Sequence, residues 1–346
     1  SDTEVIIHLI AKSSYTTFLD RFIDALRHVE GAYSLIALTP KGLIGVRDPL
    51  GVRPMVLGQL EDGVHILASE TCAFDIIGAK YVRDIQPGEM VNITKKGITS
   101  MSPFQQMKPR PCIFEHVYFS RPHSFTNNMS IYEVRKRIGI ELSKEAPAEA
   151  DIVVAVPDSG NPAALGFAQA SGLPFEMGII RNHYIGRTFI EPADHIRHLG
   201  VKLKHNANAA YLKGKRVVLV DDSIVRGTTS VKIIEMVRAA GAKEVHMRIA
   251  SPPTTNSCFY GVNTPTRKEL LASSKNVAAM CKHIGADSLA FVSIDGLYRA
   301  VYEEKRDLKN PQYCDACFTG EYPTTLTDQE QGGEERQLSL ISVNNQ

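Results

Sequence analysis

The sequence predicts an α/β protein in which a parallel sheet flanked by helices follows a domain of antiparallel strands. From residue 151 onward, apolar strands alternate with helical segments, in the order DIVVAVP, PAALGFAQASG, PFEMGII, KRVVLVDD, SVKIIEMVRAAG and EVHMRIAS. This alternation is typical of strand–helix–strand units, whose strands run parallel and whose ligands bind at the carboxyl ends of the strands. Between Gly31 and Ile93, short apolar runs instead follow one another across Pro, Gly and Asp turns, which indicates hairpins.

The antiparallel domain is predicted to begin with a helix over about residues 3–29. Its predicted strands are AYSLIALT, GLIGVR, PMVLGQL, VHILASE and MVNIT. The polar, Pro-containing stretch 101–111 has the composition of a connection between domains.

Length and composition set the broad class. At about 150 residues per domain, 346 residues predict two domains. Lys and Arg (39) balance Asp and Glu (38), so the whole-chain charge favours neither nucleic acid nor a membrane surface as a partner. No apolar stretch approaches the roughly 18 residues of a membrane span, and residues 1–14 do not read as a signal peptide. A cytoplasmic location is therefore expected, where six cysteines would stay reduced as buried thiols or metal ligands.

The most informative segment is KRVVLVDDSIVRGTTSVKIIEMVRAAGAK, residues 215–243. An apolar strand ends at Asp221 and Asp222, and two adjacent carboxylates suit a vicinal diol or Mg²⁺. The residues that follow at a helix N-terminus offer backbone N–H groups and hydroxyls to a phosphate: Gly227, Thr228, Thr229 and Ser230. An ordinary turn with surface acids is the alternative. Because the two acids, the glycine and the run of hydroxyls occur together between a strand and a helix, a ribose 5-phosphate is favoured as the ligand. The segment resembles the phosphoribosyl pyrophosphate (PRPP) signature of type I phosphoribosyltransferases.

A second strand–loop–helix spans residues 151–172, with Asp158, Ser159, Gly160 and Asn161 in the loop and Pro162 in the first helical turn. Its backbone amides could hold a pyrophosphate and the Ser159 hydroxyl could face a metal. An ordinary turn explains the loop equally well.

The stretch RNHYIGRTFI, residues 181–190, is basic and contains a glycine suited to a hinge. As a lid, it would bring Arg181 and Arg187 to a polyphosphate and Tyr184 over the sugar, and closure would exclude water. A solvated basic loop is the alternative.

Two cysteines, Cys314 and Cys317, form a C-x-x-C, whereas Cys112 and Cys258 lie far away in segments with aromatic neighbours. A zinc site, redox exchange and no function at all remain open for the C-x-x-C. The two remaining cysteines, Cys72 and Cys281, are expected to be buried thiols.

Together these segments resemble the amidophosphoribosyltransferase family, also called glutamine phosphoribosylpyrophosphate amidotransferases. The resemblance runs from Ser1 to about Tyr322. The motifs that carry it are SDTE (1–4), RDPLGVRP (47–54), LASE (67–70), IQPGE (85–89), FEHVYFSRP (114–122), RNHYIGRTFI and VLVDDSIVRGTTS (218–230).

The resemblance implies three parts of the chain. Residues 1–108 would be the C-terminal part of a glutamine amidotransferase domain of the N-terminal-nucleophile type, an αββα sandwich. Residues 109–306 would be a type I phosphoribosyltransferase domain. Residues 307–346 would be a C-terminal cluster-binding segment and a flexible tail.

The implied enzyme is a glycosyltransferase that forms 5-phosphoribosylamine from PRPP and glutamine-derived ammonia, the first committed step of purine biosynthesis. Asp221, Asp222 and Ser159 would hold Mg²⁺. The implied PRPP-binding residues are Asp158, Ser159, Gly160, Asp221, Asp222, Ser223, Arg226, Gly227, Thr228, Thr229 and Ser230, and the implied catalytic residues are Arg181, Tyr184 and Arg187. Four cysteines would bind a [4Fe–4S] cluster with a structural or oxygen-sensing role: Cys112, Cys258, Cys314 and Cys317.

The family's nucleophilic Cys and its Asn-Gly oxyanion hole lie upstream of SDTE. The chain is therefore expected to be N-terminally truncated and unable to hydrolyse glutamine alone, although Asp2 matches the acid that binds the α-amino group of glutamine. The family also implies a homotetramer and inhibition by purine nucleotides, with no nucleic-acid or membrane partner. A PRPP-sensing regulator without turnover and a phosphoribosyltransferase for a purine base or orotate are the alternatives. The net charge of +1, the glutaminase remnant and the lid argue against the sensor, and the block RDPLGVRP and LASE has no purpose in the other phosphoribosyltransferases.

Overall fold

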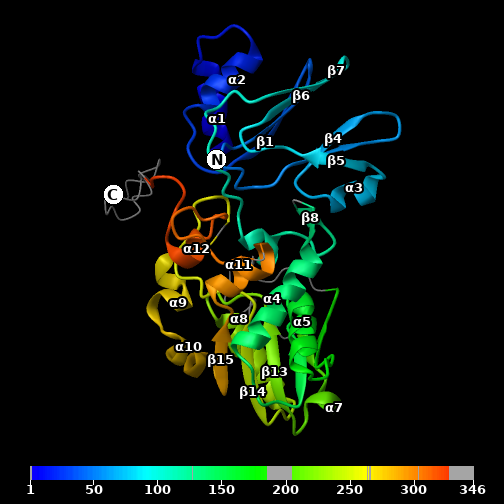
Figure 1. Ribbon diagram of the computed structural model, residues 1–346, viewed down its shortest axis with the longest axis vertical. Coiled ribbons are helices and arrows are strands. Elements are labelled where there is room, and N and C mark those ends of the chain that lie inside the picture. Colours follow the sequence, from blue (N-terminus) through cyan, green and yellow to red (C-terminus); the bar gives the residue numbers. More distant parts are fainter. Residues whose placement is uncertain are drawn as a thin grey trace, which may run out of the picture.

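The computed structural model describes residues 2–126, 128–184, 205–262, 264, 266–302 and 304–326. It has an upper domain of two antiparallel sheets and a lower domain with a parallel sheet (Figure 1). The predicted tail from residue 327 onward lies outside the described residues.

Two helices open the upper domain, α1 (Asp2–Lys12) and α2 (Phe18–Leu26), so the prediction of one helix over residues 3–29 was wrong. The break falls at the polar stretch SSYTT. Thr17 begins a new helix there, because its side chain accepts a hydrogen bond from the Asp20 amide at 3.2 Å. A Ser/Thr run competes with the helix for its own backbone and therefore favours a cap over a helix interior.

The five strands predicted in the upper domain all form. Two further strands, β5 (Lys80–Asp84) and β7 (Gly97–Met101), were not predicted. The first sheet has the order β1-β2-β6-β7, formed by β1 (Ser34–Thr39), β2 (Gly42–Arg47), β6 (Met90–Thr94) and β7 (Gly97–Met101). The second has the order β4-β3-β5, formed by β4 (His65–Ala68), β3 (Val56–Gln59) and β5 (Lys80–Asp84).

These elements stack as helix, sheet, sheet, helix. One apolar cluster joins α1 and α2 to the first sheet through Ile6, Phe22 and Val46. A second cluster fills the space between the sheets with Leu57 and Val91. Helix α3 (Cys72–Ile77) covers the second sheet, where the ring of Phe74 packs so closely on Gly58 that a Cβ there would lie 2.8 Å from it.

The lower domain contains the predicted parallel sheet, with the order β10-β13-β14-β15. Its strands are β10 (Ile152–Ala155), β13 (Arg216–Asp221), β14 (Glu244–Ile249) and β15 (Ser288–Phe291). One face packs against α4 (Ile131–Glu145), α5 (Asn161–Ser171) and α11 (Ile294–Tyr302), and the other against α8 (Thr228–Ala239) and α10 (Val277–Ile284). Strand residues buried on both faces explain the unbroken apolar runs of the sequence.

The run PFEMGII does not join this sheet as a strand. Only Phe175 makes a bridge, to Val153, and the chain then leaves the sheet. Strand β11 (Ile179–Arg181) pairs instead with β12 (His205–Ala207) in a separate antiparallel ribbon. The remaining elements are short: η1 (Glu115–Phe119), β8 (Phe125–Thr126), β9 (Met129–Ser130), α7 (Ala209–Leu212), η2 (Arg267–Glu269), α9 (Leu271–Ser274) and α12 (Ala316–Thr319).

Helices α4 and α5 approach each other at two glycines. A Cβ on Gly139 would lie 1.8 Å from the carbonyl oxygen of Ala163, and a Cβ on Gly166 would lie 1.9 Å from that of Lys136. Both helices can therefore touch backbone to backbone, which fixes the start of α5 relative to α4.

The connection between the domains is hydrogen-bonded on both sides. The amides of Arg110 and Cys112 donate to the carbonyls of Leu50 and Val52, at 2.8 and 2.9 Å. On the other side, Arg110 Nε donates to the carbonyl of Tyr313 at 2.9 Å. Segment 110–112 therefore lies between the upper domain and the C-terminal segment.

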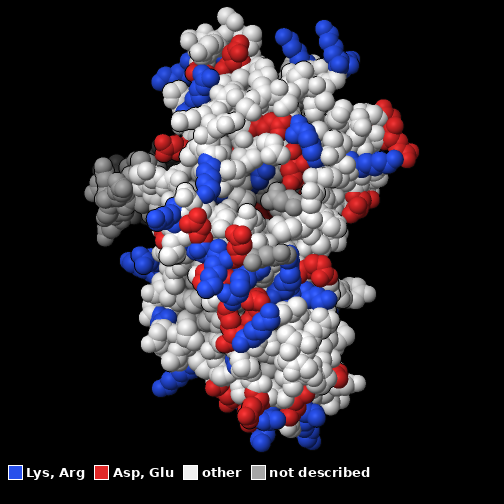
Figure 2. All heavy atoms as spheres, viewed as in Figure 1, with Lys and Arg blue, Asp and Glu red and all other residues white. Residues whose placement is uncertain are grey.

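The surface carries both charges. Figure 2 shows Lys and Arg side chains interspersed with Asp and Glu over the visible face, in keeping with a net charge of +1. Among the described residues, none of the helices combines the length and apolar character needed to cross a membrane.

Candidate functional site

The two acids of the predicted ribose site lie at the carboxyl end of β13, in the middle of the parallel sheet. Asp221 is the last residue of the strand, and the amide of Asp222 donates to Asp221 Oδ1 at 2.9 Å. Both residues are 7% exposed. This edge of the sheet is where ligands of α/β folds bind.

Burial raises the pKa of the Asp222 carboxyl. Hydrogen bonds from Ser159 and Ser223 and the positive charge of Arg135 act in the opposite direction. The acid pair therefore lies where its negative charge is poorly solvated, and a cation bound there would be favoured.

The second predicted loop meets the first one through Ser159, which hydrogen-bonds to the Asp222 side chain. Strands β10 and β13 are neighbours, so their loops leave the same edge of the sheet, and the amide of Val156 donates to the carbonyl of Val220 at 2.8 Å. A Cβ on Gly160 would lie 2.6 Å from that carbonyl oxygen, so a glycine is required for the loop to pass so close to β13.

The predicted phosphate loop forms the N-terminus of α8. Gly227 is the N-cap residue, with a φ of +80° that favours glycine. It has no side chain to cap the helix, so the first N–H groups of this twelve-residue helix are available to an anion. Thr228 and Thr229 are exposed beside them, whereas Ser230 is 3% exposed and faces the interior.

Two predicted arginines are paired with acids. Arg226, which precedes the phosphate loop, forms an ion pair with Glu269 of η2 at 3.2 Å, and both side chains are about half exposed. Arg181, at the end of β11, forms an ion pair with Asp158 of the second loop. Each guanidinium is therefore close to the site but directed at a carboxylate of the protein.

The other lid residues are only partly described. Tyr184 is 99% exposed and projects into solvent rather than over the sugar site. Arg187 lies outside the described residues. Asp2 is the first residue of α1, and its side chain lies outside what the structure describes.

The four predicted cluster cysteines come together from three distant segments. Cys112 and Cys314 form a β-bridge and are 8% and 6% exposed. The thiols of Cys112, Cys314 and Cys258 all interact electrostatically with that of Cys317. Burial is the main cause that raises the pKa of Cys314, to about 11. The amide of Tyr260 donates to Cys258 Sγ at 3.3 Å, a contact that suits a thiolate.

Aromatic residues pack in the same apolar cluster as these cysteines. Phe114 packs on Phe318 with ring centroids 6.0 Å apart, and Tyr322 packs on Phe259 at 5.2 Å. Over the described part of the chain, however, no three or more His, Cys, Asp or Glu side chains are arranged to hold a metal ion. The donor types fit an iron–sulfur cluster or zinc, while their positions are not those of a formed metal site.

The two other cysteines lie apart from this group. Cys72 is 9% exposed at the start of α3, and the half-buried Cys281 of α10 donates to the carbonyl of Ala286 at 3.2 Å. Sequence reasoning missed Arg135, the buried cation near Asp222, because it occupies an ordinary position of an amphipathic helix that carries no motif.

Comparison with known proteins agrees with this arrangement. The phosphoribosyl transferase domain family matches residues 123–250, and the glutamine amidotransferase domain family matches residues 1–75. Fold and site thus define a phosphoribosyltransferase joined to a glutamine amidotransferase domain. Amidophosphoribosyltransferase of Rhizobium etli is 56% identical over 99% of this chain and 70% of its own length. The chain therefore belongs to the amidophosphoribosyltransferase family.

Other relatives support the same assignment. The chloroplastic enzyme of Glycine max is 52% identical over 93% of this chain, which spans only 56% of that relative. The solved glutamine PRPP amidotransferase of B. subtilis, complexed with ADP and GMP, has a TM-score of 0.86 and 46% identity over 94% of this chain and 71% of its own. These matches confirm the predicted family, the α/β fold class and, at the level of the family, a glycosyltransferase of purine biosynthesis.

Proposed function

We propose that this chain catalyses the transfer of a phosphoribosyl group from PRPP to ammonia, giving 5-phosphoribosylamine and pyrophosphate. The observation that carries the proposal is the hydrogen bond between Ser159 and Asp222, which joins the two predicted loops at neighbouring strand ends. A sugar held at the acid pair would then have a phosphate-binding helix N-terminus on one side and a pyrophosphate loop on the other.

The binding roles follow from the chemistry of each group. Asp221 and Asp222 accept hydrogen bonds from the ribose hydroxyls. The N–H groups from Gly227 to Ser230 and the hydroxyls of Thr228 and Thr229 bind the 5-phosphate, with Ser223 and Arg226 beside them. The backbone amides of Asp158, Ser159 and Gly160 bind the pyrophosphate.

In the reaction, the nitrogen lone pair of ammonia forms a bond to C1 of the ribose while the C1–O bond breaks. The bonding electrons leave with pyrophosphate, and the amine product loses a proton. The transition state is oxocarbenium-like, so the residues that matter are those that hold the ribose and neutralise the leaving group. Arg181 can neutralise the leaving pyrophosphate once its guanidinium leaves Asp158 and pairs with the pyrophosphate instead. Tyr184 and Arg187 complete the lid in this proposal.

Magnesium fits the acid pair. Mg²⁺ prefers oxygen ligands and usually binds one or two carboxylates together with substrate phosphates and water. Asp221 and Asp222 supply two such carboxylates and Ser159 a hydroxyl. When bound, the ion supplies positive charge to the pyrophosphate that leaves.

We further propose that Cys112, Cys258, Cys314 and Cys317 bind a [4Fe–4S] cluster. The proposal is supported by four thiols within electrostatic reach of one another, by an N–H bond to one sulfur and by apolar packing of the cysteines with Phe114, Phe318 and Tyr322. Zinc is the competing occupant. The proposed role is structural or oxygen-sensing.

We also propose that glutamine is the nitrogen source, with Asp2 at its amino group. Purine nucleotides are proposed as inhibitors, and the chain is proposed to assemble into a homotetramer. The B. subtilis relative was solved with ADP and GMP, which supports the nucleotide proposal. The proposed glutamine amidotransferase domain ends at residue 108, and the proposed phosphoribosyltransferase domain ends at residue 306.

The function is tested with ammonium chloride as nitrogen source and Mg-PRPP as substrate. The double variant Asp221→Asn, Asp222→Asn should reduce phosphoribosylamine formation by about a hundredfold or more, the usual effect of removing a key electrostatic group. The matched control Asp75→Asn changes an exposed acid of α3 and should be fully active. Undiminished turnover by the double variant would refute the site, and PRPP binding without turnover by the unaltered chain would favour a sensor.

The cluster is tested by metal analysis of anaerobically purified protein. About four irons per chain are expected under the Cys₄ rule, and Cys258→Ser should lose them. Cys281→Ser, a thiol outside the group, should keep them. Stoichiometric zinc without iron would contradict the cluster.

A further inference from the structure

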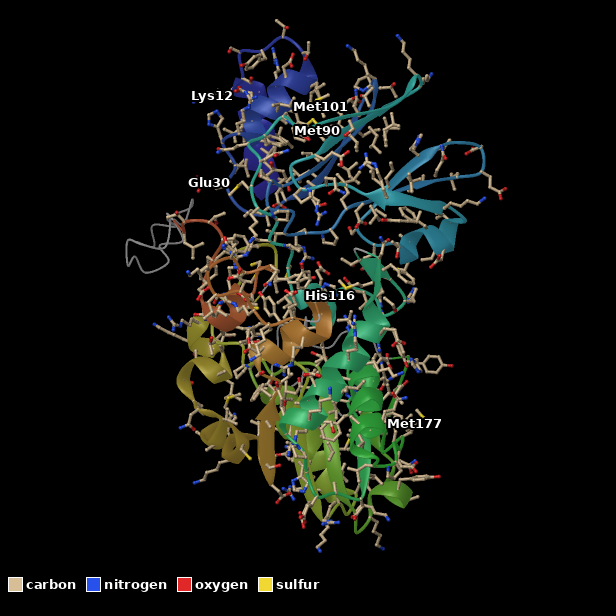
Figure 3. The ribbon with its side chains drawn as sticks, viewed as in Figure 1. Lys12, Glu30, Met90, Met101, His116 and Met177 are labelled. Atoms are coloured by element: carbon tan, nitrogen blue, oxygen red, sulfur yellow. The ribbon has the colours of Figure 1, made fainter. Side chains whose placement is uncertain are left out.

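The chain that leads from the upper domain into the lower one contains a turn of π-helix, η1 (Glu115–Phe119). The amide of Ser120 donates to the carbonyl of Glu115 at 3.2 Å, and both Glu115 and His116 are buried. Figure 3 shows His116 at the level where the two domains meet. Single π turns are rare and frequently mark functional positions.

Arg135 of α4 holds this turn from the side of the lower domain. Its Nε donates to the carbonyl of His116 at 2.8 Å, and its Nη2 donates to the carbonyls of Ser120 at 2.8 Å and Glu115 at 3.4 Å. Arg135 is 4% exposed, and the same guanidinium interacts electrostatically with Asp222. The π turn and the acid pair therefore share one buried cation.

Arg53 holds the turn from the side of the upper domain. Its Nη1 lies 3.0 Å from Glu115 Oε1, and its guanidinium lies 5.1 Å from the centroid of the Phe119 ring. The Nη1–Oε1 contact is not aligned as a hydrogen bond, so charge and ring stacking account for it. The backbone of Arg53 is fixed in turn, because Arg47 Nε donates to its carbonyl at 2.7 Å.

We infer that Arg53 is a positioning residue for the phosphoribosyl site. By binding both ends of the π turn, at Glu115 and Phe119, it fixes the carbonyls on which Arg135 is anchored near Asp222. The inference rests on the proposed function of Asp222.

The domains have other contacts that do not involve Arg53. Glu70 Oε2 accepts hydrogen bonds from the Arg121 amide at 2.6 Å and from Ser124 Oγ at 2.8 Å. Removal of Arg53 should therefore loosen the π turn while the domains stay docked. This separates a positioning role from a purely stabilising one.

The experiment compares Arg53→Met with Arg83→Met in the full chain. Arg83 pairs with the buried Glu89 at 2.6 Å inside the upper domain and does not touch η1, so it controls for the loss of one partly buried ion pair. Arg53→Met should raise KM for PRPP in the ammonia-dependent reaction by about 2- to 30-fold, the usual range for a coupling residue. Its urea midpoint should fall no further than that of Arg83→Met. Arg53→Lys, which keeps the charge but not the flat guanidinium, should give an intermediate KM.

Equal KM values for Arg53→Met and Arg83→Met would overturn the inference. A wild-type chain that neither binds nor turns over PRPP would instead refute the proposed function, which separates the two failures. If Arg53→Met does not fold, Glu115→Gln removes the partner charge at nearly constant volume, and the same rise in KM is expected. An unchanged KM in that variant would also count against the inference.

Discussion

The contact between α4 and α5 allows a sharp prediction for Gly139→Ala. The added methyl would lie 1.8 Å from the carbonyl oxygen of Ala163, whereas real Cβ atoms essentially never approach a heavy atom closer than 3.0 Å. The helices must therefore separate by at least 1.2 Å at this point. The obstacle is backbone, so no side chain can rotate away to relieve it.

The loss of unfolding free energy depends on the packing that this separation disturbs. Residues Val134, Ile138 and Phe167, all at most 1% exposed, pack around the contact. Gaps of about 0.5–1 Å already lose a quarter to a half of the dispersion energy between neighbouring atoms. Overpacking ordinarily lowers the free energy of unfolding by about 1–3 kcal/mol. Because the backbone obstacle is rigid, we expect Gly139→Ala to lower it by at least about 3 kcal/mol.

The assay is urea unfolding followed by circular dichroism, with Gly172→Ala as the matched control. Gly172 ends α5 with a φ of +73° and has nothing within 4 Å of its Cβ position, so its substitution costs only the left-handed backbone, about 1–2 kcal/mol. The double variant Gly139→Ala, Gly166→Ala should cost less than the sum of the single variants, because the first methyl has already opened the contact that the second needs. A Gly139→Ala protein as stable as Gly172→Ala would refute the reasoning.

Three further outcomes are expected. Burial raises the pKa of Asp48 to about 6, above the roughly 3.9 of an unfolded Asp, so the stability of wild type relative to Asp48→Asn should fall by about 2 kcal/mol as pH rises from 4 to 7, as seen in urea unfolding at each pH. Arg306→Met leaves the buried Asp315 carboxylate without the cation 2.6 Å away and should cost about 3–5 kcal/mol in unfolding free energy, whereas a loss below about 1 kcal/mol would contradict a buried pair. Gly160→Ala pushes the proposed pyrophosphate loop off the Val220 carbonyl and should lower kcat/KM for PRPP by about a hundredfold in a steady-state assay, and unchanged kinetics would show that this loop does not bind substrate.

The lower domain could be predicted because its pattern is local. Strand β13 is an unbroken apolar run that ends at two acids, and the helix after it starts at a glycine, so each element is visible within a short stretch of sequence. The pairing of Ser159 with Asp222 then follows from the adjacency of two parallel strands. By contrast, β5 (KYVRD) is exposed and polar, so no hydrophobic alternation marks it, and it forms only because β3 offers an edge.

Other features depend on tertiary contacts that a sequence does not display. Arg135 resembles any charged residue of an amphipathic helix until α4 packs against η1 and buries it. The split between α1 and α2 was missed because apolar spacing continues on both sides of the Ser/Thr run, and the N-cap at Thr17, which begins the second helix, was not recognised. The cysteines could be grouped through the family resemblance, whereas their chain separations alone left zinc, redox exchange and no function open.

Segment 110–112 bears on how the enzyme can move. It is hydrogen-bonded to residues 50 and 52 on one side and to the C-terminal segment at residue 313 on the other, which leaves no slack at the domain boundary. A hinge between the domains would have to break hydrogen bonds on both sides of this segment at once. Opening and closing of the phosphoribosyl site is therefore expected in its own loops, and an attempt to express either domain separately would cut through a hydrogen-bonded segment instead of a free linker.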